Sequence, residues 1–234
     1  MSFNMFDFAK LDKFINRFDA RHAFYHRIND GAKILELGCG NGDNYRAIKL
    51  LHTDVEFYGV DILPPETVDK NINYQQNNLE NTSLPFPDEV FDIILFIHVI
   101  EHLNNPIQLG KEINRVLKPQ GLVYIEAPNW ISMLIPSFGI QRNQHNPFNF
   151  FDDPSHVKPY TKQSLYEYLY QSCILKVKKI GTKRNLIKLP FDFIKLFYGI
   201  LVRDRHKVIS SVWNFSGWCI YGIGEKKSQT PSSV

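Results

Sequence analysis

The fold of this chain is decided by the stretch Ile34-Leu35-Glu36-Leu37-Gly38-Cys39-Gly40-Asn41-Gly42. An apolar run carrying one acidic residue is followed by three glycines at alternate positions, which is the pattern of a buried strand that stops and turns tightly. A helix is expected to begin near Asp43 or Asn44, so that its free N–H groups face the turn. The stretch therefore predicts a strand, a turn open to a ligand, and a helix.

A second strand end follows nineteen residues after Gly42, in Phe57-Tyr58-Gly59-Val60-Asp61. An acidic residue at this place is positioned to hold the two hydroxyls of a ribose, so the two strand ends together predict a nucleoside pocket. The dinucleotide fingerprint has a third glycine where this chain has Asp43, and Glu36 adds an acid to the turn. An acidic turn favours S-adenosylmethionine, which carries an ammonium and a sulfonium, over a ligand with a pyrophosphate.

Strand patterns alternate with helix patterns through most of the chain, which predicts a parallel sheet covered on both faces. A length of 234 residues fits one α/β domain with insertions. The expected strands are 33–38, 55–60, 72–77, 91–97, 121–127, 174–180 and 217–223, and the expected helices are 5–28, 43–52, 105–118 and 162–171.

The domain boundaries follow from changes in this pattern. We expect an N-terminal helical cap at 1–30, a main domain at 31–225 and a polar, disordered tail at 226–234. Within the main domain, 128–160 lacks periodicity and is expected to be a long acceptor loop or lid. A basic, apolar insertion is expected at 186–208.

Composition narrows the class of protein. Three widely spaced cysteines give no disulfide framework and favour a reducing, cytoplasmic setting. The first residues lack the form of a signal peptide, and no apolar run reaches the length of a membrane span. The net charge is +3, but residues 176–207 contain ten Lys or Arg against two Asp, a net of +8. An anionic partner is therefore expected to meet this late segment.

From the first strand to the last, the chain resembles the class I S-adenosylmethionine-dependent methyltransferases. The segment 36–42 matches the first motif of that family, Asp61 matches its ribose-binding acid, and the segment 77–92 is similar to its adenine segment. The resemblance implies a Rossmann-like sheet of seven strands in the order 3-2-1-4-5-7-6, with the last strand antiparallel. The cofactor-binding residues that it implies are Glu36, Gly38, Cys39, Gly40, Gly42, Asp61, Ile62, Asn78, Leu79 and Ile97. Asn78 stands where the family commonly has Asp, and its amide oxygen can still accept a hydrogen bond from the adenine amino group.

The segment after the fourth strand, Ile97-His98-Val99-Ile100-Glu101-His102, carries candidate catalytic side chains. If a helix begins there, His98, Glu101 and His102 share one face and, with His156, can hold a divalent cation. The arrangement is similar to ubiquinone-type and small-RNA O-methyltransferases, which have Glu where this chain has His98. The alternative is that the Glu-His pair only anchors the loop, as in many relatives without a metal. In that case His98 or His156 remains a candidate general base.

These features lead us to expect O-methylation of a small molecule or of a saccharide intermediate, free or lipid-linked. The stretch 149–156 is similar to methyltransferases of bacterial polysaccharide clusters. Methylation of nitrogen or RNA, a nucleotide-dependent oxidoreductase and a non-catalytic cofactor-binding protein remain alternatives. The apolar part of 186–208, ringed by cations, is expected either to lie in a membrane interface, at its inner face, or to cover the sheet edge or a dimer contact. Nucleic acid is disfavoured, because no aromatic-interleaved recognition motif accompanies the basic cluster.

Overall fold

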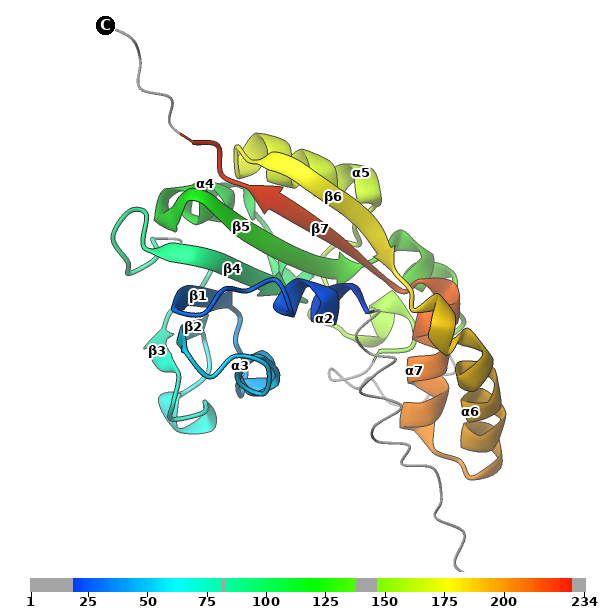
Figure 1. Ribbon diagram of the computed structural model, residues 1–234. Coiled ribbons are helices and arrows are strands. Elements are labelled where there is room, and N and C mark those ends of the chain that lie inside the picture. Colours follow the sequence, from blue (N-terminus) through cyan, green and yellow to red (C-terminus); the bar gives the residue numbers. More distant parts are fainter. Residues whose placement is uncertain (1–18, 81–82, 138–146, 229–234) are drawn as a thin grey trace, which may run out of the picture.

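The computed structural model describes residues 19–80, 83–137 and 147–228 and contains one sheet of seven strands in the order β3-β2-β1-β4-β5-β7-β6 (Figure 1). Strands β1 to β5 are parallel, whereas β7 is antiparallel to both β5 and β6. The predicted fold class, strand order and antiparallel last strand are confirmed. The strands are β1 (Ala32–Leu37), β2 (Val55–Asp61), β3 (Asn73–Gln76), β4 (Phe91–Ile97), β5 (Leu117–Pro128), β6 (Lys176–Lys183) and β7 (Cys219–Glu225).

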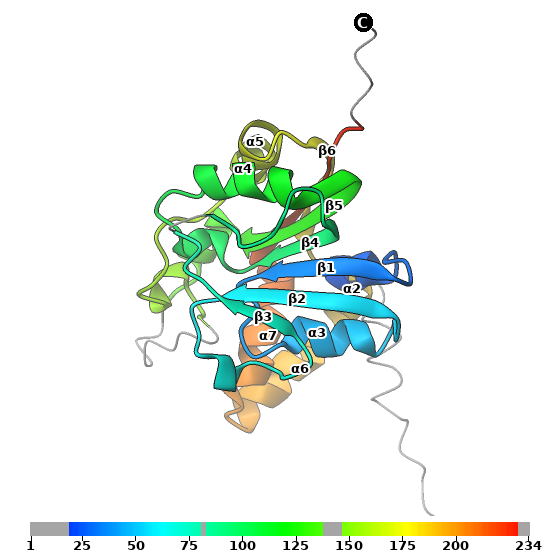
Figure 2. The same cartoon turned by 90° about the vertical axis from the view of Figure 1, so that its left-hand side faces the viewer.

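Helices cover both faces of this sheet, as the alternating pattern predicts. In Figure 2, α4 and α5 lie on one side of the sheet and α3 lies on the other. The helices here are α2 (Ala20–Tyr25), α3 (Asp43–Lys49), α4 (Ile107–Val116) and α5 (Lys162–Glu167), which continues as a π-helical turn at Tyr168–Ser172. Covering both faces buries all but one residue of β1 and of β4, which is why these strands read as nearly continuous apolar runs.

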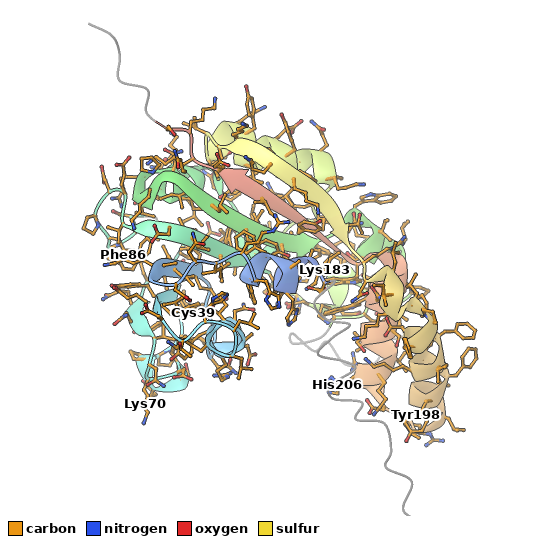
Figure 3. The ribbon with its side chains drawn as sticks, viewed as in Figure 1. Cys39, Lys70, Phe86, Lys183, Tyr198 and His206 are labelled. Atoms are coloured by element: carbon orange, nitrogen blue, oxygen red, sulfur yellow. The ribbon has the colours of Figure 1, made fainter. Side chains whose placement is uncertain are left out.

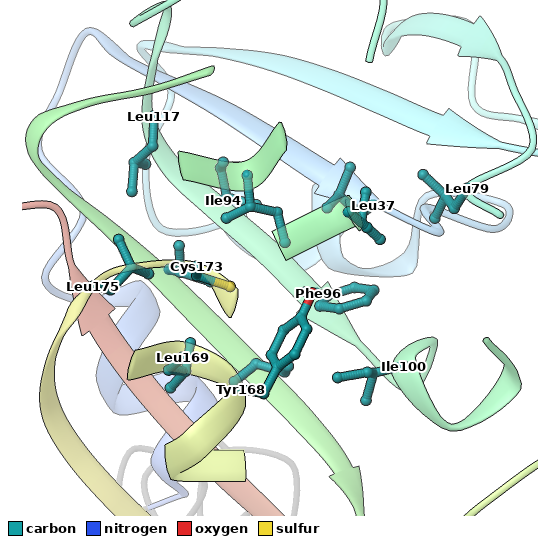
Figure 4. Packing of buried hydrophobic residues seen from close by; sticks show 14 of the residues in the cluster. Leu37, Leu79, Ile94, Phe96, Ile100, Leu117, Tyr168, Leu169, Cys173 and Leu175 are labelled. Carbon is teal, nitrogen blue, oxygen red and sulfur yellow. The ribbon is translucent and has the colours of Figure 1, made fainter. Parts of the chain in front are cut away.

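Two hydrophobic cores result, one on each face. The first joins strands β1, β4 and β5 to α4, α5 and the π-helical turn, and Figure 4 shows Ile94 and Phe96 of β4 opposite Tyr168 and Leu169 of that turn. The second core joins the same sheet to α2 and α3 and contains Phe24, Tyr25 and Ile48. Because the sheet is fixed from both sides, the carboxyl ends of its parallel strands form a rigid edge.

The described residues cover two of the predicted boundary regions only in part. The amphipathic helix expected over 5–28 is represented by α2 alone, since residues 1–18 lie outside the described part of the chain. The prediction that a disordered tail begins at residue 226 is wrong for that residue. Lys226 is buried, and its Nζ donates hydrogen bonds to the carbonyl oxygens of Asn114 (2.8 Å) and Leu117 (2.7 Å), because β7 extends to Glu225 and carries the chain over α4.

The two irregular regions of the late third are now resolved into short elements. After β5, the chain forms 3₁₀ turns at Trp130–Leu134 and Phe150–Asp152. After β6, the insertion forms a 3₁₀ turn at Leu186–Lys188 and a hairpin of two helices, α6 (Leu189–Leu201) and α7 (Arg205–Ser216), which stands out from the sheet (Figure 1). None of the helices in the described ranges has the length and apolar character needed to traverse a bilayer.

The two-sided packing makes a prediction about stability. Leu109 of α4 is completely buried, whereas Leu50 at the end of α3 is 81% exposed. We expect Leu109→Ala to lower the free energy of unfolding by about 2–5 kcal/mol, because it leaves a cavity in the first core. The matched substitution Leu50→Ala is expected to change it by less than about 0.5 kcal/mol. Denaturant titrations of the two variants test this, and equal losses would contradict the packing.

Candidate functional site

The glycine turn after β1 has the open backbone that the sequence predicts. Gly38 and Gly40 have φ angles of +73° and +52°, in the left-handed region that side chains disfavour. A Cβ at Gly38 would lie 2.2 Å from Cγ2 of Val99, so the turn fits closely against the segment after β4. At Gly40, by contrast, a Cβ would meet nothing within 4 Å, and this side of the turn is open to a ligand.

The other predicted cofactor residues lie at the ends of neighbouring strands. Asp61 ends β2, and its Oδ2 accepts a hydrogen bond from the Gly40 N–H at 2.8 Å, which ties the two strand ends together. Ile62, next in the chain, is 64% exposed and suits contact with a flat ring. Asn78 Oδ1 accepts from the Glu80 N–H at 2.9 Å, so this oxygen already has one local partner. The remaining residues of the predicted set, Cys39, Leu79 and Ile97, are buried beside them.

Glu36 is the chemically distinctive group on this side of the site. Its side chain is buried in β1, and burial raises the pKa of its carboxyl to about 8. Asn44 at the start of α3 donates a hydrogen bond to Oε1 at 2.5 Å, whereas Oε2 is buried without a partner among the described residues. A buried carboxyl oxygen without a donor is costly, so this position is suited to a cationic group.

A second buried carboxylate, Glu126 near the end of β5, is fully compensated. Arg21 of α2 donates to both of its oxygens, Lys183 of β6 lies 3.2 Å from Oε2, and the Tyr124 hydroxyl donates to Oε1 at 2.5 Å. Burial alone would raise the pKa of Glu126, but the charges of Arg21 and Lys183 hold it well below its usual range. Glu126 was not predicted from the sequence, because its partners are far away along the chain and leave no local pattern.

Helix α2 connects the two carboxylates. Besides its pair with Glu126, Arg21 lies 3.4 Å from Oδ1 of Asn44 through Nη1, and the Tyr25 hydroxyl donates to the same oxygen at 2.7 Å. Asn44 is thereby oriented so that its amide group faces Glu36. The expected N-terminal cap thus reaches into the site itself.

His98 does not lie on a helix with Glu101 and His102, as the sequence interpretation assumed. Its φ angle is +54°, and only Ile100–His102 form a single 3₁₀ turn. The His98 ring lies between two carboxylates, 3.3 Å from Glu101 Oε1 and 3.6 Å from Glu126 Oε2, with the Cys219 sulfur 3.8 Å away. Burial alone would lower the pKa of His98, but the Cys219 sulfur and Glu101 raise it to about 10, so the ring holds a proton at neutral pH.

Three of the four residues predicted as metal ligands do come together. One ligand atom each of Glu101, His102 and His156 lies within 4.8 Å of the other two, and His98 is outside this trio. The loop that carries His156 is held in place by the Val157 N–H, which donates to the Glu101 carbonyl oxygen at 2.7 Å.

Backbone carbonyl groups orient both imidazoles of the trio. His156 Nδ1 lies 2.7 Å from the Phe150 carbonyl oxygen, and His102 Nδ1 lies 3.2 Å from that of Ser155. A carbonyl oxygen can only accept, so each Nδ1 carries a proton, and in a neutral ring Nε2 keeps the lone pair. Burial lowers the pKa of His156, which favours the neutral ring. Glu101 Oε2 is also buried without a partner among the described residues, so with neutral imidazoles the trio presents acceptors only.

A cleft of about 630 Å³ is lined by the trio and by His98. It extends from Asp43 beside the glycine turn, past the trio, to the inner face of the α6–α7 hairpin. Trp213 and Trp218 stack there with ring centroids 4.5 Å apart. The wall of the cleft carries charges of both signs, which come from Asp19, Arg21, Asp153, Lys183, Lys188 and Asp192.

The residues on the glycine-turn side fit the cofactor that the family resemblance implies. S-adenosylmethionine has an ammonium that matches the uncompensated oxygen of Glu36, and its ribose matches the acid that follows β2. The open side of Gly40 leaves room for the ligand against the turn.

Comparison with known proteins agrees with this geometry. A family model described as a methyltransferase domain matches residues 3–172. A ubiquinone/menaquinone biosynthesis C-methyltransferase of Shewanella sp. is 27% identical over 208 residues, which cover 82% of this chain and 80% of that protein.

Two solved structures share the fold. An S-adenosylmethionine-dependent methyltransferase of Mesorhizobium loti has a TM-score of 0.60 at 15% identity, covering 88% of this chain and 96% of that one. Phosphoethanolamine N-methyltransferase 2 of Haemonchus contortus, in complex with S-adenosyl-L-methionine, has a TM-score of 0.59 at 15% identity. The match covers 89% of this chain and 52% of that one. The family model decides between the alternatives left open by the sequence, in favour of methyl transfer over nucleotide-dependent oxidation. The chain therefore belongs to the class I S-adenosylmethionine-dependent methyltransferases.

Proposed function

We propose that this methyltransferase acts on a hydroxyl oxygen of an acceptor bound in the cleft, and that His156 removes the hydroxyl proton. The observation that carries the proposal is the trio of Glu101, His102 and His156, in which acceptor atoms converge without a donor. A hydroxyl is the complementary group, since it brings the missing proton.

On the cofactor side, we assign Glu36 to the ammonium and Asp61 to the ribose, with Ile62, Asn78 and Leu79 around the adenine. S-adenosylmethionine, when bound, supplies a methyl group on a positively charged sulfur. The protein has to hold the acceptor oxygen about 3 Å from that methyl group and keep water away. We also assign to the cofactor side the residues that follow β1 or end β4, which are Gly38, Cys39, Gly40, Gly42 and Ile97.

His156 is the better base of the two predicted histidines. Its Nδ1–H is directed to the Phe150 carbonyl oxygen, which leaves the Nε2 lone pair for the substrate proton. His98 holds its own proton between Glu101 and Glu126, so we assign it the role of positioning these carboxylates. His102 and Glu101 are then left to orient the acceptor.

A saccharide or a similarly hydroxyl-rich small molecule fits the acceptor end of the cleft. The half-buried indole of Trp213, which stacks on the buried Trp218, offers flat apolar surface, and charged and polar side chains line the cleft around it. Methylation of carbon, the reaction in the name of the Shewanella relative, is the second candidate because that relative matches over 82% of this chain. A methyl-transfer assay with a labelled cofactor and a metabolite extract separates the two, since the site of the label in the product differs.

The assignment of Glu36 predicts a pH dependence of binding. In the free protein the Glu36 carboxyl keeps its proton up to about pH 8, and an ammonium binds only the ionised form. We therefore expect the affinity for S-adenosylhomocysteine to rise with pH, by up to about tenfold per unit, and to level off above about pH 8. Calorimetry across this range measures the effect. Glu36→Gln is expected to bind more weakly and to lose the slope, and a slope that survives this substitution would refute the assignment.

The assignment of His156 predicts a loss of turnover without a loss of cofactor binding. We expect His156→Ala to lower kcat by about 10²–10⁴-fold, the usual contribution of a general base, while the affinity for S-adenosylhomocysteine stays within about twofold. His206→Ala, at an exposed position on the hairpin, is the matched control and is expected to retain full activity. Equal turnover in the two variants would eliminate His156 as the base.

The same three atoms are also a donor set for a divalent cation, so the experiment includes a chelator. With His156 as the base, activity is expected to survive dialysis against a chelator. Activity that is lost on dialysis and restored by a divalent cation would instead make Glu101, His102 and His156 metal ligands.

A further inference from the structure

Helix α6 has its apolar and polar sides reversed relative to an ordinary surface helix. Asp192 and Gly199 are buried, and Lys195 is half-buried on the same side of the helix. Every fully exposed residue of the helix is apolar or aromatic, whereas a surface helix normally points such residues inward. The exposed arc consists of Pro190, Phe191, Phe193, Ile194, Phe197, Tyr198, Ile200 and Leu201.

The packing of α6 on α7 accounts for this orientation. A Cβ at Gly199 would lie 2.9 Å from Cβ of Lys207, so the two helices approach closely on that side. Asp192 accepts a hydrogen bond from Asn214 of α7 at 2.6 Å. The inner side is therefore committed to α7, and Figure 3 shows Tyr198 and His206 toward the end of the hairpin that is remote from the sheet. Among the described residues, nothing covers the outer arc.

Cations stand at both ends of the exposed arc. Arg184 and Lys188 precede α6, and Arg203 and Arg205 follow it. No acidic side chain in the described ranges forms an ion pair with Arg203 or Arg205. An apolar arc with aromatic residues and basic ends is the arrangement of helices that lie in the headgroup region of a bilayer. Thirteen residues give α6 a length of about 20 Å, too short to span a membrane but suited to lying along its surface.

We propose that the outer arc of α6 docks this enzyme onto bilayers that contain anionic lipids. The apolar arc would enter the boundary between headgroups and acyl chains, while Arg203 and Arg205 at one end and Arg184 at the other meet the lipid phosphates. The three arginines at the two ends of the arc complement such a surface. If a second copy of the chain docked on this arc, its arginines would repel those of the first copy. We therefore favour the bilayer as the partner.

The docking surface and the cleft share one hairpin. Lys188 and Asp192 of its first half and Trp213 and Asn214 of α7 line the cleft, whereas the outer arc of α6 faces away. Packed helices lie about 8–10 Å apart, so the cleft would be within roughly one helix diameter of the lipid surface. If the proposed O-methylation holds, an acceptor with a lipid anchor is the substrate class that this arrangement favours.

Vesicle sedimentation of the full chain tests the docking without reference to activity. We expect the protein to pellet with mixed phosphatidylcholine–phosphatidylglycerol vesicles and to stay in solution with pure phosphatidylcholine. Binding should weaken as salt is raised, because the cations are screened. Leu201→Glu is expected to weaken binding about tenfold or more, since it places a charge in the arc, and Arg203→Ser combined with Arg205→Ser is expected to act in the same direction.

Leu50→Glu is the matched control, because Leu50 on α3 is as exposed as Leu201, at 81% each. It is expected to bind like the unmodified protein, and circular dichroism verifies that all variants are folded. Equal binding by Leu201→Glu and Leu50→Glu, or no binding to anionic vesicles, would overturn the proposal. A dimer in solution that Leu201→Glu converts to a monomer, without vesicle binding, would identify the arc as a subunit contact and also overturn it. Loss of activity in His156→Ala leaves this result unaffected, so the two proposals fail separately.

Discussion

Two buried carboxylates, Glu36 of β1 and Glu126 of β5, impose the main physical constraint on this site. Each takes an acidic group out of water, which costs several kcal/mol unless donors or cations compensate it. Glu126 receives two cations and a hydroxyl, so its charge is balanced by the protein itself. Glu36 receives one amide hydrogen and leaves one oxygen for a ligand. This difference is the basis for proposing that Glu36 binds the cofactor and that Glu126 has a structural role.

The compensation also explains why the N-terminal segment belongs to the site. Arg21 contacts Glu126 and Asn44, and Asn44 contacts Glu36, so α2 links the two buried carboxylates. The link consists of hydrogen bonds between side chains of α2, α3, β1 and β5. A change in the charge of Glu36 on ligand binding would therefore be felt at α2, because buried polar groups in one network respond together.

The hairpin of α6 and α7 lines one end of the cleft and stands out from the sheet and its covering helices. Its inner face contributes tryptophan and asparagine side chains to the cleft, and its outer face is apolar. A class I sheet supplies the cofactor side in much the same way in many enzymes, so the acceptor is selected by parts added to it. The segment of 3₁₀ turns between β5 and α5 is also an addition to the sheet. It brings His156 close to Glu101 and His102, which follow β4.

The sequence by itself determined the sheet order, through the family resemblance, and the glycine turn, because strand alternation and close-packed glycines are local patterns. The sequence also led to the prediction that Glu101, His102 and His156 lie together. It did not determine the conformation of His98, whose φ angle is positive and whose ring lies between Glu101 and Glu126, next to Cys219. Nor did it identify Arg21, which is 105 residues from its partner Glu126. Only the tertiary structure decided these points, because the state of a buried charge depends on which distant groups surround it, and sequence spacing carries no record of them.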